Sequence, residues 1–92
     1  MLSENVVRKI EYLCHHRGLL EIELLFSKFF EHHKLDIINY SEDEKDLLMS
    51  ILEIDDNFLL QQFNQTSYNI DEDIVDSHIF HQISEYYNLE NH

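Results

Sequence analysis

The chain has 92 residues, a formal net charge of −13, one glycine and no proline. Its length allows one domain, and the scarcity of helix breakers favours an all-α fold over turn-rich β folds. The negative charge argues against nucleic acid and against anionic membrane surfaces as partners, because both repel an acidic protein.

The charge is uneven along the chain. Residues 1–40 carry six acidic and five basic side chains, whereas residues 41–92 carry thirteen acidic side chains and a single basic one, Lys45. The acidic half favours solubility, and the N-terminal half need not bind a basic partner. The single cysteine, Cys14, cannot form an internal disulfide and fits a reducing cytoplasm. We expect a cytoplasmic protein without membrane insertion, since no apolar run approaches the roughly 20 residues that a membrane span needs.

Hydrophobic periodicity predicts about five helices, packed as a compact antiparallel array in a single domain over residues 1–92. The first helix is expected to start after an N-cap at Ser3 and to reach about Cys14. The only glycine, Gly18, marks a turn where a left-handed or tight backbone costs least. A second helix is expected from about Leu19 to His33. Its predicted core face is rich in aromatic residues and consists of Leu19, Ile22, Leu25, Phe26, Phe29 and Phe30.

Residues 34–40 are expected to connect the second helix to the third. Ser41 and Glu44 match a capping box, in which each side chain bonds the backbone N–H of the other residue. Apolar residues at helical spacing follow this signal, so a third helix is predicted there. These residues are Leu47, Leu48, Ile51 and Leu52.

A short fourth helix is expected to start at Asp55-Asp56, and a polar loop is expected over residues 64–69. A fifth helix is predicted from about Asp71 to Asn88, with Asn69 or Asp71 as its N-cap. One side of this helix is expected to pack into the core through Val75, Ile79, Ile83, Tyr86 and Tyr87.

The turn between the first two helices holds the most distinctive chemistry. Arg17 carries a planar, permanently charged guanidinium that can bind a carboxylate or a phosphate through two hydrogen bonds. Gly18 beside it allows the backbone of a partner to approach closely. Glu21 lies in the first turn of the next helix, where the helix dipole favours a negative charge. These three residues are candidates for a partner-binding site, and we expect Arg17→Ala to leave the fold intact.

Leu20 and Leu24 lie on the side of the second helix away from its aromatic face, next to Glu21 and Lys28. Two interpretations are open. Either the two leucines form an exposed docking surface, or they pack against a further helix, because a five-helix array can bury the second helix on two sides.

Several segments together resemble the family of succinate dehydrogenase flavinylation factors. The segment from Arg17 to Glu21 is similar to the family's R-G-x-x-E signature. Phe29-Phe30-Glu31 resembles its F-F-E motif, and residues 41–59, SEDEKDLLMSILEIDDNFL, resemble its S-x-D-E-K run followed by L-L-E-x-D-D. The signature alone is weakly specific, but the ordered blocks after it make the resemblance specific over about residues 6–84.

The resemblance implies an assembly factor of about five helices and not an enzyme. Members bind the flavoprotein subunit of succinate dehydrogenase or fumarate reductase and promote covalent attachment of FAD to a histidine of that subunit. By resemblance, Arg17, Gly18 and Glu21 contact the subunit near its flavin. Arg17 then either pairs with an acidic group of the subunit or stabilises negative charge on the flavin. No G-x-G-x-x-G segment is present, so we expect no FAD bound tightly to the chain itself.

The candidate partner-binding set extends beyond the signature. Glu23 stands where the family commonly has aspartate, but it points away from Glu21 on a helix, so we rank Glu21 above it. His16 stands where the family often has a second basic residue, and a mostly neutral histidine weakens electrostatic docking at neutral pH. Gln62 and Asn57 replace a tryptophan and a proline, which affects packing more than chemistry. The full candidate set is His16, Arg17, Gly18, Leu20, Glu21, Glu23 and Leu24.

A metal site is a rival interpretation of the last predicted helix. His78, His81 and Glu85 share one of its faces, and imidazole and carboxylate groups suit zinc. A solvated polar face explains the same pattern and is the more common outcome.

Two further functional interpretations concern the N-terminal half. Cys14 and His15 could act as nucleophile and base, but Cys14 lies on an apolar helix face, which favours a buried structural thiol. A helical interaction module of another class, antitoxin-like or regulatory, could use the same surface from Arg17 to Glu21 on a different target.

Overall fold

The computed structural model describes residues 2–64 and 70–90, and within these ranges the chain forms six α-helices. In chain order they are α1 (Leu2–His15), α2 (Leu20–Ile38), α3 (Glu42–Leu52), α4 (Asp56–Phe63), α5 (Glu72–Val75) and α6 (His78–Glu90). The predicted all-α fold is confirmed. Residues 65–69, with the alternative cap Asn69, lie outside the described part of the chain. α1 already includes Leu2, so Ser3 lies within this helix and the prediction that it caps the helix start is wrong.

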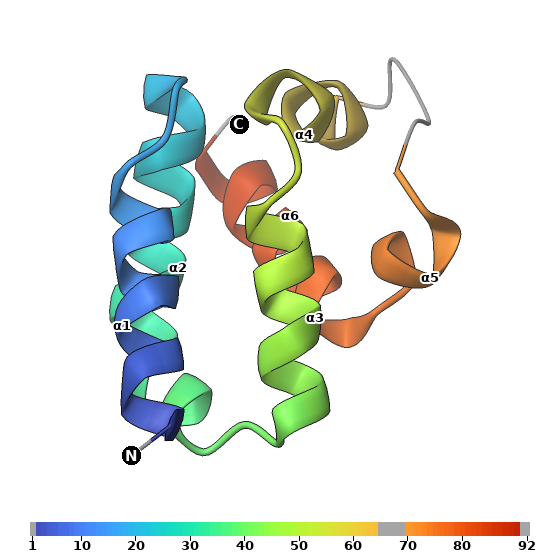
Figure 1. Cartoon of the computed structure of the whole chain (residues 1–92). Helices are drawn as coiled ribbons and strands as arrows, with labels where there is room; N and C mark the ends of the chain where they lie inside the picture. The colour runs from blue at the N-terminus through green and yellow to red at the C-terminus, as the bar shows by residue number, and fades with distance from the viewer. Residues whose placement is uncertain (1, 65–69, 91–92) are drawn as a thin grey trace.

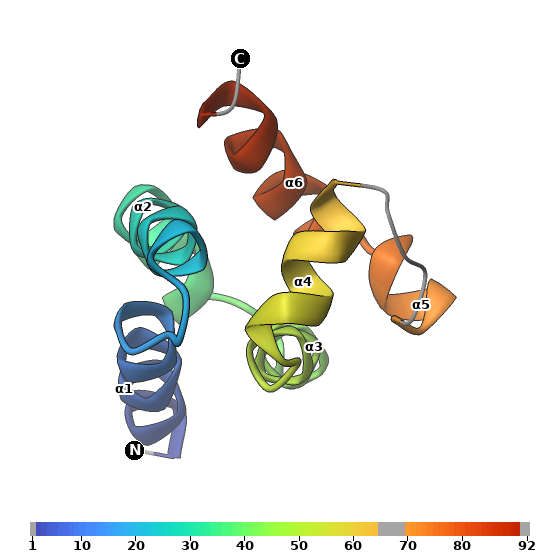
Figure 2. The ribbon, with the colours of Figure 1, turned by 90° about the horizontal axis from the view of Figure 1, so that it is seen from above.

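Four helices form the body of the molecule. α1 packs on α2 and on α3, while α6 packs on α2 and on α3, so that these four helices surround a common interior. Figure 2 shows this arrangement from above, with α4 lying across the end of α3. The turn between α1 and α2 and the turn between α3 and α4 lie at the same end of the bundle, opposite the N-terminus (Figure 1). This shared end brings two turns together that are far apart in the sequence.

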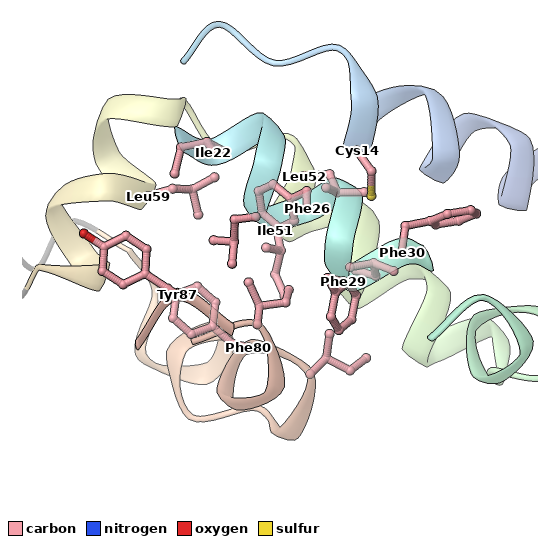
Figure 3. Close-up of a cluster of buried hydrophobic side chains, with 14 of the residues drawn as sticks. Cys14, Ile22, Phe26, Phe29, Phe30, Ile51, Leu52, Leu59, Phe80 and Tyr87 are labelled. Atoms are coloured by element: carbon pink, nitrogen blue, oxygen red, sulfur yellow. The ribbon is translucent and has the colours of Figure 1, made fainter. Parts of the chain in front are cut away.

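Apolar side chains from five helices meet in one core. Figure 3 shows Cys14 of α1, Phe26 of α2, Leu52 of α3, Leu59 of α4 and Phe80 of α6 converging on the interior. The predicted aromatic face of α2 is buried, except that Leu19 is only partly buried. Dense packing of such large side chains is the main stabilising contribution in a domain of this size.

The second helix is longer than predicted. We expected residues 34–40 to form a connector, but α2 continues to Ile38. The backbone of His33 leaves the helical region (φ −115°, ψ 16°), so the helix bends there instead of ending. Beyond the bend Ile37 is fully buried, and the free energy of burying this side chain favours continuing the helix.

The predicted start signals of the third and fourth helices are confirmed. The Glu44 N–H donates to Ser41 Oγ (3.2 Å), and the Ser41 N–H donates to Glu44 Oε1 (3.0 Å), completing the capping box. The bond from the Ser41 backbone is the main reason that the pKa of Glu44 is lowered. Asp55 caps α4 by accepting the N–H of Asn57 at 2.8 Å.

The last predicted helix is two helices. Asp71 caps the short α5, as expected, but the helix is interrupted at residues 76–77, and α6 begins at His78. Ser77 Oγ donates to the carbonyl of Ile74 and accepts the N–H of Phe80. Serine competes with the helical backbone in this way, which explains the break. Among the described helices, none is both long enough and apolar enough to span a membrane.

Phe29 provides a test of the core. Phe29→Ala should lower the free energy of unfolding by about 3–5 kcal/mol, because it leaves a cavity where a fully buried ring was. Urea denaturation followed by circular dichroism measures the change. Leu35→Ala is the matched control on the same helix, since Leu35 is 76% exposed and its loss should cost no more than about 0.5 kcal/mol. Equal effects of the two substitutions would contradict this assignment of the core.

Candidate functional site

The candidate site is the shared end of the bundle, where residues 16–19 connect α1 to α2. Beside this connection runs an open groove of about 700 Å³. One wall is formed by the connection itself, including His16 and Gly18, and the other by residues 52–57 of the turn between α3 and α4. We call this connection, residues 16–19, the corner. It is open to solvent, as a partner-binding site requires.

Arg17 lines this groove, but its guanidinium is bound within the chain. Its Nε–H and one N–H of its second terminal nitrogen donate to Asp56 Oδ1, at 2.9 and 2.6 Å. Its other three N–H groups donate to the carbonyls of Leu13 (3.2 Å), Leu52 (2.6 Å) and Ile54 (3.1 Å). An arginine has five such donors, so all of them are used within the chain.

Burial reinforces this arrangement. The side chains of Arg17 and Asp56 are only 6% and 10% exposed, and the guanidinium carbon lies 5.2 Å from the centre of the Phe26 ring. Our expectation that the guanidinium of Arg17 is free to bind a carboxylate or a phosphate of a partner is therefore wrong. The physical reason is that a charge in this position loses most of its water and must be paired inside the protein. The expectation that Arg17→Ala leaves the fold intact needs the same correction.

Asp56 is the residue that sequence reasoning missed. We expected Asp55-Asp56 only to start a helix, and Asp55 performs that capping. Asp56 Oδ1 binds Arg17, and its Oδ2 accepts the backbone N–H of Leu19 at 3.0 Å. The sequence signals were an acid next to the capping Asp55 and its place in the L-L-E-x-D-D run, neither of which names a partner. Such a signal does not identify an arginine 39 residues earlier as its partner.

Gly18 lies in the exposed part of the corner. Its backbone φ is outside the left-handed region, so of the two expected alternatives, a left-handed backbone or a tight turn, the left-handed one is not adopted. A Cβ built on Gly18 would lie 3.5 Å from Asp56 Oδ2, an ordinary contact distance. The fold thus tolerates a methyl group at this position, and any requirement for glycine comes from outside the chain.

The two leucines next to the corner are exposed. Leu20 is 68% exposed and Leu24 is 54% exposed, which decides between the two interpretations in favour of an apolar pair open to solvent. Glu21 between them is also exposed, whereas Glu23 is partly buried. This difference agrees with ranking Glu21 above Glu23. The corner therefore offers two apolar side chains and one carboxylate on the first turns of α2.

His16 completes the exposed set. Its ring stacks on Tyr12 at a centroid distance of 4.0 Å, and its Nδ1–H donates to the Tyr12 carbonyl at 2.9 Å. This contact fixes the ring at the rim of the groove. Six of the seven candidate residues lie at the accessible corner or next to it. The seventh, Arg17, has a buried side chain whose hydrogen bonds hold the corner in place.

Cys14 is a buried thiol, as predicted. Burial, slightly offset by the Arg17 charge, raises its pKa to about 12, so it is neutral at physiological pH. The neighbouring His15 is engaged elsewhere, because its Nδ1 lies 2.8 Å from the hydroxyl of Ser27. This geometry does not support a nucleophile–base pair.

The face of α6 that suggested a metal does not assemble one. His78 Nε2 lies 3.3 Å from Glu44 Oε2, across the contact between α6 and α3. Among the side chains described, those of residues 5–64 and 70–88, no group of three or more His, Cys, Asp or Glu is arranged to hold a metal ion.

Comparison with known proteins identifies one relationship. A family model described as "Flavinator of succinate dehydrogenase" matches residues 8–87. The match includes both walls of the groove and both members of the buried ion pair. No curated protein and no solved structure matches the chain.

The buried pair makes a stability prediction. Arg17→Ala should lower the free energy of unfolding by about 3–5 kcal/mol. The substitution leaves the buried carboxylate of Asp56 without its cationic partner and three carbonyls without their hydrogen-bond donors. Chemical denaturation measures this loss. Lys34→Ala removes an exposed charge from the same half of the chain and should change stability by less than about 0.5 kcal/mol. A stability of Arg17→Ala equal to that of the control would show that the pair contributes nothing.

Cys14 gives an independent test of burial. Burial raises the pKa of Cys14 to about 12, so the thiol stays protonated at pH 8, whereas the thiolate is the reactive form. The native chain should therefore react with a disulfide reagent such as DTNB only as fast as it unfolds, whereas the chain in denaturant should react at once. Immediate, complete labelling of the native chain would contradict the buried position.

Proposed function

The chain belongs to the family of flavinators of succinate dehydrogenase, and from this premise we propose that it binds the immature flavoprotein subunit of succinate dehydrogenase or fumarate reductase and promotes covalent attachment of FAD to it. The observation that carries the proposal is the family match over residues 8–87, with its signature residues around an accessible corner. A regulatory or antitoxin-like role has no comparable support.

The proposed docking surface is the exposed part of the corner. Leu20 and Leu24 supply apolar area one helical turn apart, and both side chains are more than half exposed. Glu21 supplies a charge that a cationic group of the partner can match. Gly18 supplies a stretch of backbone without a side chain, which a partner can approach closely. His16 lies beside this surface at the rim of the groove.

Arg17 and Glu23 have different parts in this proposal. All N–H groups of Arg17 are engaged within the chain, so it supports docking by holding the corner in shape. Glu23 is partly buried and contributes at the edge of the surface. Both stay within the proposed binding region, but neither replaces the exposed residues as the main contact.

The proposed mechanism is that of an assembly factor and not of an enzyme. The electrophilic flavin and the histidine that attacks it both belong to the flavoprotein subunit. Holding two reacting groups in a productive geometry can lower a barrier substantially without any catalytic group from the factor. By binding one conformer of the immature subunit, the chain would increase the population of that reactive geometry. The buried free thiol is compatible with a cytoplasmic site of action.

Gly18→Arg tests the docking surface. The new side chain would occupy the space that a partner backbone needs, and covalent FAD in the partner should fall by about tenfold or more, equivalent to about 1.4 kcal/mol of lost binding. Fluorescence of the denatured flavoprotein subunit on a gel measures covalent flavin. The fold should persist, because the corner is open to solvent at this position.

Leu35→Arg is the matched control for Gly18→Arg. It introduces the same side chain on an exposed position at the far end of α2 and should leave flavin incorporation unchanged. Normal covalent FAD with Gly18→Arg would remove this surface from the proposal.

A further inference from the structure

We propose that Asp56 is a positioning residue for partner docking, although it lies outside the exposed surface and outside the signature. Its carboxylate ties the first turn of α2 to the turn between α3 and α4. This inference rests on the proposed function, because it concerns how the same docking surface is held in place.

Both oxygens of Asp56 are committed to the corner. Oδ1 accepts two hydrogen bonds from Arg17, and Oδ2 accepts the N–H of Leu19 at 3.0 Å. Arg17 and Leu19 flank Gly18 on either side, so the exposed glycine is fixed through both of its neighbours. The carboxylate also lies beneath the glycine, since a Cβ at Gly18 would be 3.5 Å from Oδ2. One side chain therefore sets the position of the corner backbone.

Asp56 also bonds the residue at the start of α2, which has no capping side chain. The N-cap residues of α3, α4 and α5 are Ser41, Asp55 and Asp71, whose own side chains accept a backbone N–H of the first turn. The N-cap residue of α2 is Leu19, whose side chain has no polar atom. Asp56 accepts the N–H of Leu19 and places a negative charge near the helix N-terminus, which the helix dipole favours.

The exposed docking residues come next in the sequence after Leu19, which Asp56 holds in place. Leu20 and Glu21 are the first residues of α2, and Leu24 is one turn further along. In the described part of the chain, these three side chains make no hydrogen bond to residues 52–57. The hydrogen-bonded link between the start of α2 and that wall of the groove therefore runs through Leu19 and Arg17. Loosening the carboxylate would leave every exposed side chain present but less well placed. A surface that must be ordered on binding binds more weakly.

Asp56→Asn separates positioning from contact. Asparagine keeps one acceptor oxygen but replaces the other with an NH₂ donor, so it cannot serve both Arg17 and the Leu19 N–H. The matched control is Asp71→Asn, which makes the same change at the N-cap of α5, where asparagine caps as well as aspartate. Each full-length variant is tested at a temperature where its circular dichroism is native.

Three measurements are made with purified flavoprotein subunit lacking covalent FAD. For Asp56→Asn we expect the dissociation constant of the complex to rise by about tenfold. Covalent FAD should fall when the factor is limiting and recover when it is in excess, because positioning affects binding and not the partner's chemistry. The Leu19 amide should exchange faster with solvent, while amides in the middle of α3 keep their protection. Asp71→Asn should match the unsubstituted chain in all three.

The outcomes distinguish this inference from the proposed function. Unchanged affinity of folded Asp56→Asn, with normal binding by the unsubstituted chain, would overturn the role of Asp56 and leave the proposed function standing. An unsubstituted chain that neither binds the subunit nor raises its covalent FAD would overturn both. If Asp56→Asn does not fold, Asp56→Glu decides the matter, since it keeps the charge and both oxygens but displaces them by one methylene. Native affinity of Asp56→Glu despite fast exchange of the Leu19 amide would then refute the positional requirement, because binding would not depend on the bond that fixes the corner.

Discussion

The ion pair between Arg17 and Asp56 is the constraint on which the end of the bundle depends. Neither side chain is more than 10% exposed, so both charges have lost most of their hydration. Such a pair is tolerated only when its remaining hydrogen-bonding groups are satisfied as well. Here three backbone carbonyls and one backbone N–H complete the set, and they come from α1, the start of α2 and the turn after α3. The pair thereby makes one structural unit of two turns.

This unit separates support from recognition. The buried side holds the charged network and the Phe26 ring, and its chemistry is fully used within the chain. The exposed side holds Gly18, Leu20, Glu21 and Leu24, whose chemistry is directed outwards. Because the buried network holds the exposed residues in place, less conformational entropy is lost when a partner binds them. In the proposed function the signature arginine thus belongs to the base, and the glycine and glutamate belong to the surface.

A second connection secures α2 at its other end. Where the helix bends, the Nδ1–H of His33 donates to Asp36 at 3.2 Å, and a hydrogen bond of 3.1 Å joins His33 Nε2 to the hydroxyl of Tyr86. The Phe29 ring packs against both His33 and Tyr86. α2 is therefore held to α3 and α4 at its first residue and to α6 near its bend, with the aromatic core between the two points. This arrangement explains how a small domain keeps one helix in a defined orientation.

Much of the fold could be predicted from sequence because it depends on contacts within four residues along the chain. The capping box of Ser41 and Glu44 and the caps at Asp55 and Asp71 are of this kind. The core face of α2 was predictable for another local reason, the helical spacing of its apolar residues. The break at Ser77 is local too, but a serine within an otherwise regular helical pattern gives an ambiguous signal. Family membership also followed from ordered motifs along the chain.

Tertiary structure alone decided the roles of the corner residues. The exposure of Leu20 and Leu24 depends on how many sides of α2 other helices cover, which periodicity does not report. The continuation of α2 past His33 depends on the burial of Ile37 in a core built by distant segments. The burial of Arg17 depends on Asp56, 39 residues away, and on carbonyls that face it only after α3 has packed against α1. A sequence pattern identifies a charge, but only the packing of separate helices determines whether water or another side chain neutralises it.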